Sequence, residues 1–185
     1  MFYIIELSLR YPELSMRRIL SSNQHQRLIK MVNLEDIRSR TTTVREYIEG
    51  MKGKGQDKFL SVYNEYQVNQ EVLSELEEFA PDITVVVISA SWCGDCVNAI
   101  PVLLRLEEEI GLEVRSFGKV KTAPLDPDVQ WAVPPSPPEM NKWKVKAIPW
   151  IEIFDREGNR LGTIIEKPSK KPTLEEEILY HLKDK

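Results

Sequence analysis

The spacing of hydrophobic residues along the chain changes near residue 83. From residue 36 to residue 80, apolar side chains recur every three or four positions, which predicts amphipathic helices. A run of threonines at residues 41–43 offers a helix cap, and glycines between residues 50 and 55 break the pattern. Tyrosines and acidic residues in the later stretches are interpreted as core and solvated positions. The apolar positions are Val44, Tyr47, Ile48 and Met51, then Phe59, Leu60, Tyr63 and Tyr66, then Val72, Leu73, Leu76 and Phe79.

A β-branched run at residues 83–88 has almost no polar member, which is typical of a strand buried on both faces of a sheet. Helical spacing returns between Cys93 and Ile110, and Gly111 is placed to end that helix. Apolar and polar residues alternate along residues 112–120, which predicts a second strand. This part of the chain is therefore expected to form strand, helix and strand in turn.

Six of the 12 prolines lie between residues 124 and 138 and mark one irregular loop. A short helix is expected around residues 139–143. Trp131 and Trp143, in or beside the loop, are interpreted as packing residues.

An apolar run at residues 150–154 turns at Gly158 and Asn159 and returns as residues 161–166, which predicts an antiparallel hairpin. A last amphipathic helix is predicted at residues 173–184. This order of elements predicts an α/β sandwich of helix and sheet layers with a mixed central sheet.

Charge and length exclude some functions. The 185 residues carry 25 Lys and Arg against 29 Asp and Glu, a formal net charge of −4, whereas a general nucleic-acid binder needs a basic face. Residues 1–30 contain five basic and two acidic residues (+3), and residues 31–185 contain 20 and 27 (−7). No apolar run is long enough for a membrane-spanning helix, and the start lacks the basic lead of a signal peptide. A cytoplasmic location is therefore expected.

Three regions are expected: an N-terminal arm at residues 1–35, a helical extension at 36–80 and the α/β domain at 81–185. The arm has no sustained hydrophobic period, so we expect residues 1–30 not to be needed for folding or catalysis. Two alternatives stay open. Met31 would be the natural start, or residues 2–9 would pack on the body as a strand or helix.

Cys93 and Cys96 are the only cysteines, and they lie where the buried strand meets the following helix. Two cysteines three positions apart in a first helical turn can form a disulfide with little backbone movement. The helix N-terminus favours a thiolate at Cys93, whereas Cys96 is expected to be buried and to resolve a mixed disulfide. Zinc would need about four ligands, and His25 and His181 lie near the chain ends. No metal is therefore expected.

Residues 92–96, Trp-Cys-Gly-Asp-Cys, resemble the active-site motif of the thioredoxin superfamily. Pro101 stands where thioredoxins kink the active-site helix, and Ile148-Pro149 matches their isoleucine–cis-proline step, which faces the cysteines. The resemblance covers residues 81–184 and implies a thioredoxin-like three-layer sandwich. With Glu46-Tyr47-Ile48-Glu49 in the helical preface, the Gly-Asp form of the motif is similar to an uncharacterised bacterial and archaeal branch of thioredoxin-like proteins.

Two departures from the thioredoxin pattern bear on the chemistry. Thioredoxins carry a buried aspartate six positions before the first cysteine, where it is thought to help proton movement at the second; here that position is Val87. The residues between the cysteines are Gly94 and Asp95 instead of glycine and proline. The charge of Asp95 is expected to oppose thiolate formation at both sulfurs, although an acid in a first helical turn also favours the helix.

Pro149 has no N–H to give to a sheet, so an edge-facing strand that begins there would leave the Ile148 backbone free to pair with a substrate. Trp92 and Trp150 are expected to provide an apolar surface beside the cysteines. The predicted substrate-binding residues are thus Trp92, Ile148, Pro149 and Trp150, with Gly94 and Asp95 modulating the cysteines.

The sequence predicts a thiol–disulfide oxidoreductase that reduces or exchanges protein disulfides through Cys93 and Cys96, without a bound cofactor. Its partners would be protein disulfides and a dithiol electron donor similar to thioredoxin reductase. A thioredoxin-fold binding or adaptor module with non-catalytic cysteines stays open as an alternative. So does a glutaredoxin-like glutathione-dependent reductase, although the segment after Pro149 lacks the glycine pair and acidic residue that glutaredoxins use.

Overall fold

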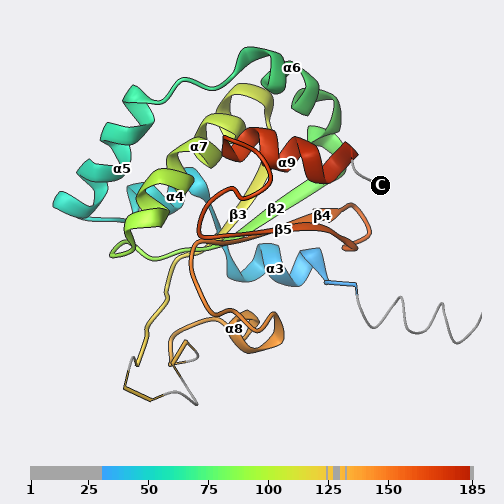
Figure 1. Ribbon diagram of the computed structural model, residues 1–185. Coiled ribbons are helices and arrows are strands. Elements are labelled where there is room, and N and C mark those ends of the chain that lie inside the picture. Colours follow the sequence, from blue (N-terminus) through green and yellow to red (C-terminus); the bar gives the residue numbers. More distant parts are fainter. Residues whose placement is uncertain (1–30, 124, 127–129, 132, 184–185) are drawn as a thin grey trace, which may run out of the picture. The chain divides into compact units, whose positions relative to one another are not determined.

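The computed structural model describes residues 31–123, 125–126, 130–131 and 133–183 (Figure 1). Residues 33–185 form one compact unit, and every element below lies in it. Residues 1–30 of the expected N-terminal arm lie outside the described residues, so the expectations for them stay predictions.

A five-stranded mixed sheet forms the centre of this unit, with the strand order β1-β3-β2-β4-β5. Among the described strands, β2 and β3 pair in parallel, and the other neighbours are antiparallel. The predicted α/β fold with a mixed sheet is confirmed. The strands are β1 (Thr42–Thr43), β2 (Ile83–Ile88), β3 (Glu113–Phe117), β4 (Trp150–Asp155) and β5 (Arg160–Ile165).

Helices cover both faces of the sheet. Figure 1 shows α7 (Gly94–Ile110) and α9 (Leu174–Lys183) on one side and α3 (Leu34–Arg40) on the other. All six residues of β2 are buried, which agrees with the β-branched run predicted as a central strand. The last residue of β2, Ile88, is therefore also buried in the core.

Helix α7 carries the cysteine motif at its start. Cys93 is its N-cap, and Gly111 ends it in the left-handed conformation with φ 66°, as the sequence predicts. Pro101 lies inside the helix and is buried. Because Ile100, Leu103 and Leu106 are fully buried, α7 is fixed firmly against the core.

Helices α4 (Val44–Glu49), α5 (Lys54–Glu65) and α6 (Gln70–Phe79) follow the predicted apolar stretches, and a 3-10 turn (Ala80–Asp82) leads into β2. Phe59 and Leu76 are the fully buried residues of α5 and α6. The Arg105 side chain, from α7, lies over the ring of Tyr63 in α5, 4.1 Å from the ring centroid. It also donates a hydrogen bond to the Tyr63 carbonyl. The helical preface thus packs directly on the cysteine-bearing helix.

Strand β1 was not predicted. Thr42 and Thr43 pair antiparallel with Ser116 and Arg115 of β3. Thr43 also caps α4, because its side chain accepts from the Glu46 N–H while the Glu46 carboxylate accepts from the Thr43 N–H. A two-residue strand leaves no periodic signal in the sequence, whereas the capping role of the threonine run was predicted.

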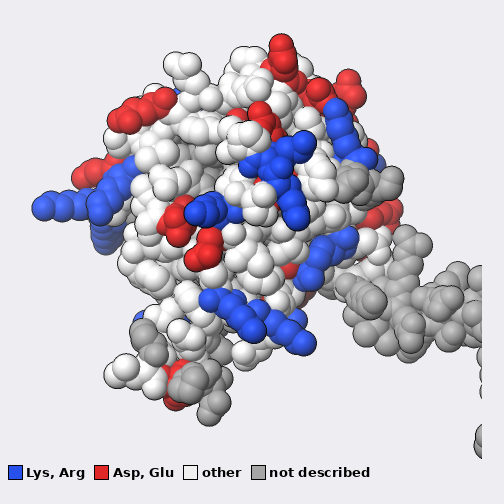
Figure 2. All heavy atoms as spheres, in the orientation of Figure 1, with Lys and Arg blue, Asp and Glu red and all other residues white. Residues whose placement is uncertain are grey.

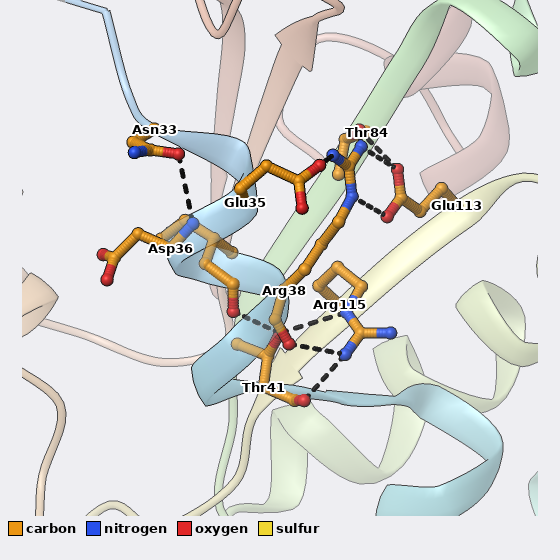
Figure 3. Close-up of polar contacts among 9 residues, drawn as sticks. Asn33, Glu35, Asp36, Arg38, Thr41, Thr84, Glu113 and Arg115 are labelled. Carbon is orange, nitrogen blue, oxygen red and sulfur yellow. Dashed lines mark hydrogen bonds and ion pairs between the residues drawn. The ribbon is translucent and has the colours of Figure 1, made fainter.

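Helix α3 is tied to the sheet by two arginines (Figure 3). Arg38 donates to both carboxylate oxygens of Glu113, at 2.6 and 2.7 Å, and these bonds hold the pKa of Glu113 below its ordinary value. The Thr84 hydroxyl donates to the same carboxylate at 2.8 Å. Arg115 donates to the Thr41 side chain and to the carbonyls of Arg38 and Thr41. These bonds fix the segment that leads into β1 and α4.

The predicted short helix is α8 (Glu139–Lys142), and the hairpin and last helix are also present. The strand expected at residues 112–120 ends earlier, at Phe117, because its parallel partner β2 ends opposite that residue. Trp143 is a packing residue, as interpreted: its ring centroid lies 6.4 Å from that of Phe117 and 5.9 Å from that of Phe154.

Basic and acidic side chains are interspersed over the face of the molecule in Figure 2. No helix within the described ranges is both long and apolar enough to span a membrane.

Candidate active site

The two cysteines lie at the turn between β2 and α7. The Cys93 N–H donates to the Ala90 carbonyl at 3.1 Å, which closes the turn. As N-cap, Cys93 offers its sulfur to the N–H of Cys96, 3.4 Å away. The sulfur thus takes the capping position that a serine or aspartate oxygen usually occupies, facing the positive end of the helix dipole.

Cys93 meets the segment before β4. Its thiol donates to the Ile148 carbonyl at 3.3 Å, and the Ile148–Pro149 peptide bond is cis. The structure therefore brings Cys93, Ile148 and Pro149 together, from positions more than fifty residues apart in the chain.

Both thiols are free and both cysteines are buried, Cys96 more deeply than Cys93. Cys93 is 9% exposed and Cys96 is fully buried. Burial raises the pKa of Cys96 to about 12, and the neighbouring Cys93 acts in the same direction, whereas hydrogen bonds with Ser89 and the Ala90 backbone act against it. Cys96 therefore stays a thiol in the resting reduced protein.

The predicted substrate-binding tryptophans differ in their surroundings. Trp92 is 57% exposed next to Cys93, so its ring is available to a partner. Trp150 is partly buried and donates its indole N–H to Glu152 at 2.8 Å. Gly94 and Asp95 are exposed in the first turn of α7, and a Cβ at Gly94 would meet no atom within 4 Å.

One expectation about Pro149 is wrong. The strand that follows it is not at an edge, because β4 lies between β2 and β5. The Pro149 carbonyl accepts from the Glu166 N–H at 2.8 Å, and the Ile148 carbonyl faces Cys93. The apolar run predicts that β4 is a strand, but it does not predict which strands pair with β4, because those strands are distant in the sequence.

At position 87, where thioredoxins carry a buried aspartate, this protein has an apolar side chain. Val87 is fully buried and pairs with Ile151, whereas the buried acid Glu152 pairs with Val86. Because adjacent residues on a strand face opposite sides, Glu152 lies on the sheet face away from Val87. It accepts from Thr163 and Trp150 and pairs with Arg160, and burial raises its pKa.

Two residues near the cysteines were not predicted as site residues. Ser89 directly follows β2 and is fully buried, and it acts to lower the pKa of Cys96. The Tyr47 hydroxyl, from α4, lies 3.2 Å from the Ser89 hydroxyl. The sequence carries no local signal for this contact, because Tyr47 falls on an ordinary apolar stripe.

A groove of about 280 Å³ runs beside the motif. Asp95 and Asn98 of α7 line one side, and Ile151, Ile164 and Glu166 line the other.

Within the described part of the chain, no group of three or more His, Cys, Asp or Glu side chains is placed to hold a metal ion. His181 lies in α9, and His25 lies outside the described residues.

A cysteine pair at a strand-to-helix turn, facing a cis-proline across a mixed sheet, defines a thioredoxin-like protein. A family model described as thioredoxin (Thioredoxin_9) matches residues 41–178, and the chain belongs to this family. The match begins well before residue 81, so it includes α4, α5 and α6, which precede β2, but not α3. The narrower resemblance to the Gly-Asp branch stays a prediction.

Solved structures show the same fold. A Pseudomonas aeruginosa protein of unknown function superposes with a TM-score of 0.59 at 15% identity, covering 83% of this chain and 90% of that one. An HIV epitope scaffold superposes with a TM-score of 0.58 at 14% identity, covering 82% and 88%. No curated protein sequence matches the chain.

Proposed function

We propose that the protein is a thiol–disulfide oxidoreductase that acts on protein disulfides. The observation that supports this most is the contrast between the two sulfurs. Cys93 caps α7, where its sulfur receives the Cys96 N–H, while Cys96 lies fully buried one turn further in. Such a pair suits a nucleophile that meets the substrate and a second thiol that resolves the intermediate.

The reaction proceeds in two exchanges. The Cys93 thiolate attacks one sulfur of the substrate disulfide, so that a mixed disulfide forms and one substrate thiolate leaves. Cys96 then loses its proton and attacks the Cys93 sulfur, which releases the second substrate thiolate and closes the Cys93–Cys96 disulfide. Two electrons pass to the substrate, and a partner dithiol protein returns them, so no bound cofactor is needed.

The substrate would dock beside Cys93. Trp92 is the large exposed apolar side chain next to the nucleophile, and the backbone of Ile148 and Pro149 approaches the same sulfur. The Trp150 indole is bonded to Glu152 on the other face of the sheet, so Trp150 is left out of this docking surface. Trp92, Ile148 and Pro149 support a peptide site in which the substrate disulfide lies between Trp92 and the proline segment.

Single-turnover chemistry tests the proposal without a natural electron donor. The reduced wild-type protein should reduce a model protein disulfide stoichiometrically and end with a Cys93–Cys96 bond. Cys96→Ser should stop at a mixed disulfide on Cys93, and Cys93→Ser should not react. If wild type and Cys93→Ser are equally inactive, the cysteines are not catalytic and an adaptor role replaces the enzyme.

The same variants can identify the partners. Cys96→Ser should retain substrate proteins covalently from a lysate, and a reducing agent should release them. Cys93→Ser is the matched control. Proteins that bind both variants equally do so without thiol exchange and would support the adaptor role. Retention of glutathione alone would favour the glutaredoxin-like alternative.

A further inference from the structure

The groove of about 280 Å³ beside the cysteine motif is lined by residues of two kinds. Two acidic residues, Asp95 and Glu166, line it and are exposed. A groove with apolar walls and exposed carboxylates suits a side chain that has a long hydrocarbon stem and a cationic head. The buried residues that line the groove are all apolar, namely Ala99 and Val102 of α7, Ile151 of β4, Ile164 of β5 and Leu174 of α9.

Both acidic residues lie close to the nucleophile. Asp95 follows Cys93 by two positions, in the first turn of α7. Glu166 directly follows β5, and its N–H donates to the Pro149 carbonyl at 2.8 Å. Pro149 in turn follows Ile148, whose carbonyl lies 3.3 Å from the Cys93 sulfur. The groove therefore borders the place at which a substrate disulfide would meet Cys93.

The backbone of Glu166 has a defined conformation. Its φ is 60°, in the left-handed region that residues other than glycine adopt infrequently. The N–H of the next residue, Lys167, donates to the Ile165 carbonyl at 2.7 Å. Together with the bond to Pro149, this contact forms a tight turn at the end of β5. Glu166 is therefore held beside the groove while its side chain stays exposed.

The two carboxylates are available to a ligand. Among the described residues, neither Asp95 nor Glu166 has a side-chain hydrogen bond or an ion pair. Glu175, by contrast, accepts from the hydroxyl of the lining residue Tyr66 at 2.8 Å. Lys167 also lines the groove, so two carboxylates face one ammonium and the lining has a net formal charge of −1. The groove can therefore accept a further positive charge.

We propose that this groove is a subsite for a lysine or arginine side chain of the substrate protein, close in sequence to the cysteine that Cys93 attacks. The inference rests on the proposed function and names its substrate class, protein disulfides flanked by a basic residue. The hydrocarbon stem would lie along the apolar lining, and Asp95 and Glu166 would hold the cation. The same charges would disfavour a substrate with an acidic residue at that position.

The first exchange measures this preference directly. In Cys96→Ser the reaction stops at the mixed disulfide, so that only the attack by Cys93 is observed. The substrates are single-cysteine peptides of glycine, serine and glutamine, joined through a disulfide to a coloured aromatic thiol. Attack forms a bond between the Cys93 sulfur and the peptide sulfur and releases the coloured thiolate. One glutamine, at each of two positions on either side of the cysteine in turn, is replaced by lysine, norleucine or glutamate.

A basic residue should accelerate this exchange. At one or more positions, we expect the lysine peptide to react about threefold to tenfold faster than the glutamine peptide at low ionic strength, and the glutamate peptide to react more slowly. Norleucine has the stem without the charge and should react more slowly than lysine. The advantage of lysine should decline in high salt, because salt screens exposed charges.

Variants made in the Cys96→Ser protein assign the preference to the groove. Glu166→Gln keeps the size of the side chain, and the ratio of the lysine rate to the glutamine rate should fall toward one. Glu166→Lys should favour the glutamate peptide instead. Lys167→Gln should raise the ratio, because it removes a competing cation. Glu77→Gln is the matched control, since it removes an exposed carboxylate of α6 and should leave the ratio unchanged.

Equal rates for the lysine and glutamine peptides at all four positions would overturn the proposal. An equal fall of the ratio in Glu166→Gln and Glu77→Gln would also overturn it, since the preference would then reflect the charge of the whole protein. Norleucine that reacts as fast as lysine would show an apolar subsite that does not recognise a cation. Failure of the proposed function gives a different result: Cys93 would form a mixed disulfide with none of the peptides, and the inference would fall with it.

Discussion

Arg40 donates hydrogen bonds to both carboxylate oxygens of Glu139, at 2.9 and 2.8 Å, although the two residues are 99 positions apart. Glu139 is only 2% exposed, and Arg40 also pairs with Asp36 within α3. The guanidinium lies over the Phe117 ring as well, 5.4 Å from its centroid. This bond pair attaches α8, and with it the end of the proline-rich loop, to the α3 side of the sheet.

We expect Arg40→Met to lower the free energy of unfolding by about 3 kcal/mol at neutral pH, because it leaves a buried carboxylate without its main partner. Urea denaturation measures the change. Arg45→Met is the control, since Arg45 is exposed and its pairs with Glu49 and Glu108 are surface pairs worth about 0–1 kcal/mol. Equal losses in both variants would contradict the special role of the Arg40–Glu139 pair.

The same variant should change the response to acid. Burial raises the pKa of Glu139, but the bonds and charge of Arg40, a backbone hydrogen bond and the charge of Lys142 together hold the pKa below the ordinary 4.5. A lowered pKa in the folded state stabilises above the ordinary pKa and is lost as pH falls through the lowered value. The stability gap between wild type and Arg40→Met should therefore narrow below pH 4.5. A gap that stays constant on acidification would count against this account.

The two cysteines should differ in reactivity. We expect an alkylating reagent at near-neutral pH to modify Cys93 first, because Cys96 is fully buried and has a pKa of about 12. Peptide mass spectrometry of the reduced protein after brief labelling gives the order. In Cys93→Ser, Cys96 should remain largely unlabelled until the protein is unfolded. Preferential labelling of Cys96 in the native wild type would reverse the assigned roles.

Asp95 should influence the reduction potential. Its exposed carboxylate lies in the first turn of α7, between the cysteines in sequence, and a negative charge there is expected to disfavour a second negative charge on a nearby sulfur. Asp95→Asn should favour the reduced pair and raise the potential by about 10–30 mV, measured by equilibration with a glutathione redox series. Asp57→Asn changes an equivalent first-turn acid of α5 and should leave the potential unchanged. No shift in Asp95→Asn would make Asp95 a helix-start residue only.

The contribution of Glu152 to the free energy of unfolding should decrease as pH rises. Burial raises its pKa, although bonds with Thr163 and Trp150 and the charge of Arg160 act against the shift. A group whose pKa is raised on folding stabilises the fold at low pH, and this contribution is lost as pH rises through the raised value. Glu152→Gln should therefore gain stability relative to wild type as pH increases above 4.5. Glu157→Gln, in the exposed β4–β5 turn, should show no such trend.

Local patterns predicted the parts of the site that lie close together in the chain. The apolar run of β2, the helix that follows and the cysteine spacing indicated the strand–turn–helix arrangement, and Ile148-Pro149 indicated the facing segment. Each of these depends on neighbouring residues, so the signal is contained in a short window.

Contacts between distant segments could not be predicted in this way. Tyr47 fits an amphipathic helix whether or not its hydroxyl reaches Ser89, and Thr42–Thr43 is too short to show alternation. The position of β4 inside the sheet, instead of at its edge, depends on β5 pairing beyond it. Burial alone requires only that these residues be apolar or small, and it leaves their partners unspecified.

The sheet order has a consequence for the sequence of events during synthesis. Strand β2, α7 and β3 are contiguous and pair locally, whereas β4 must join β2 from the far side of the proline-rich loop. Local contacts generally form before distant ones. The nascent chain therefore exposes both thiols before Ile148 and Pro149 have left the ribosome, and we expect the dithiol to be open to oxidation until β4 docks.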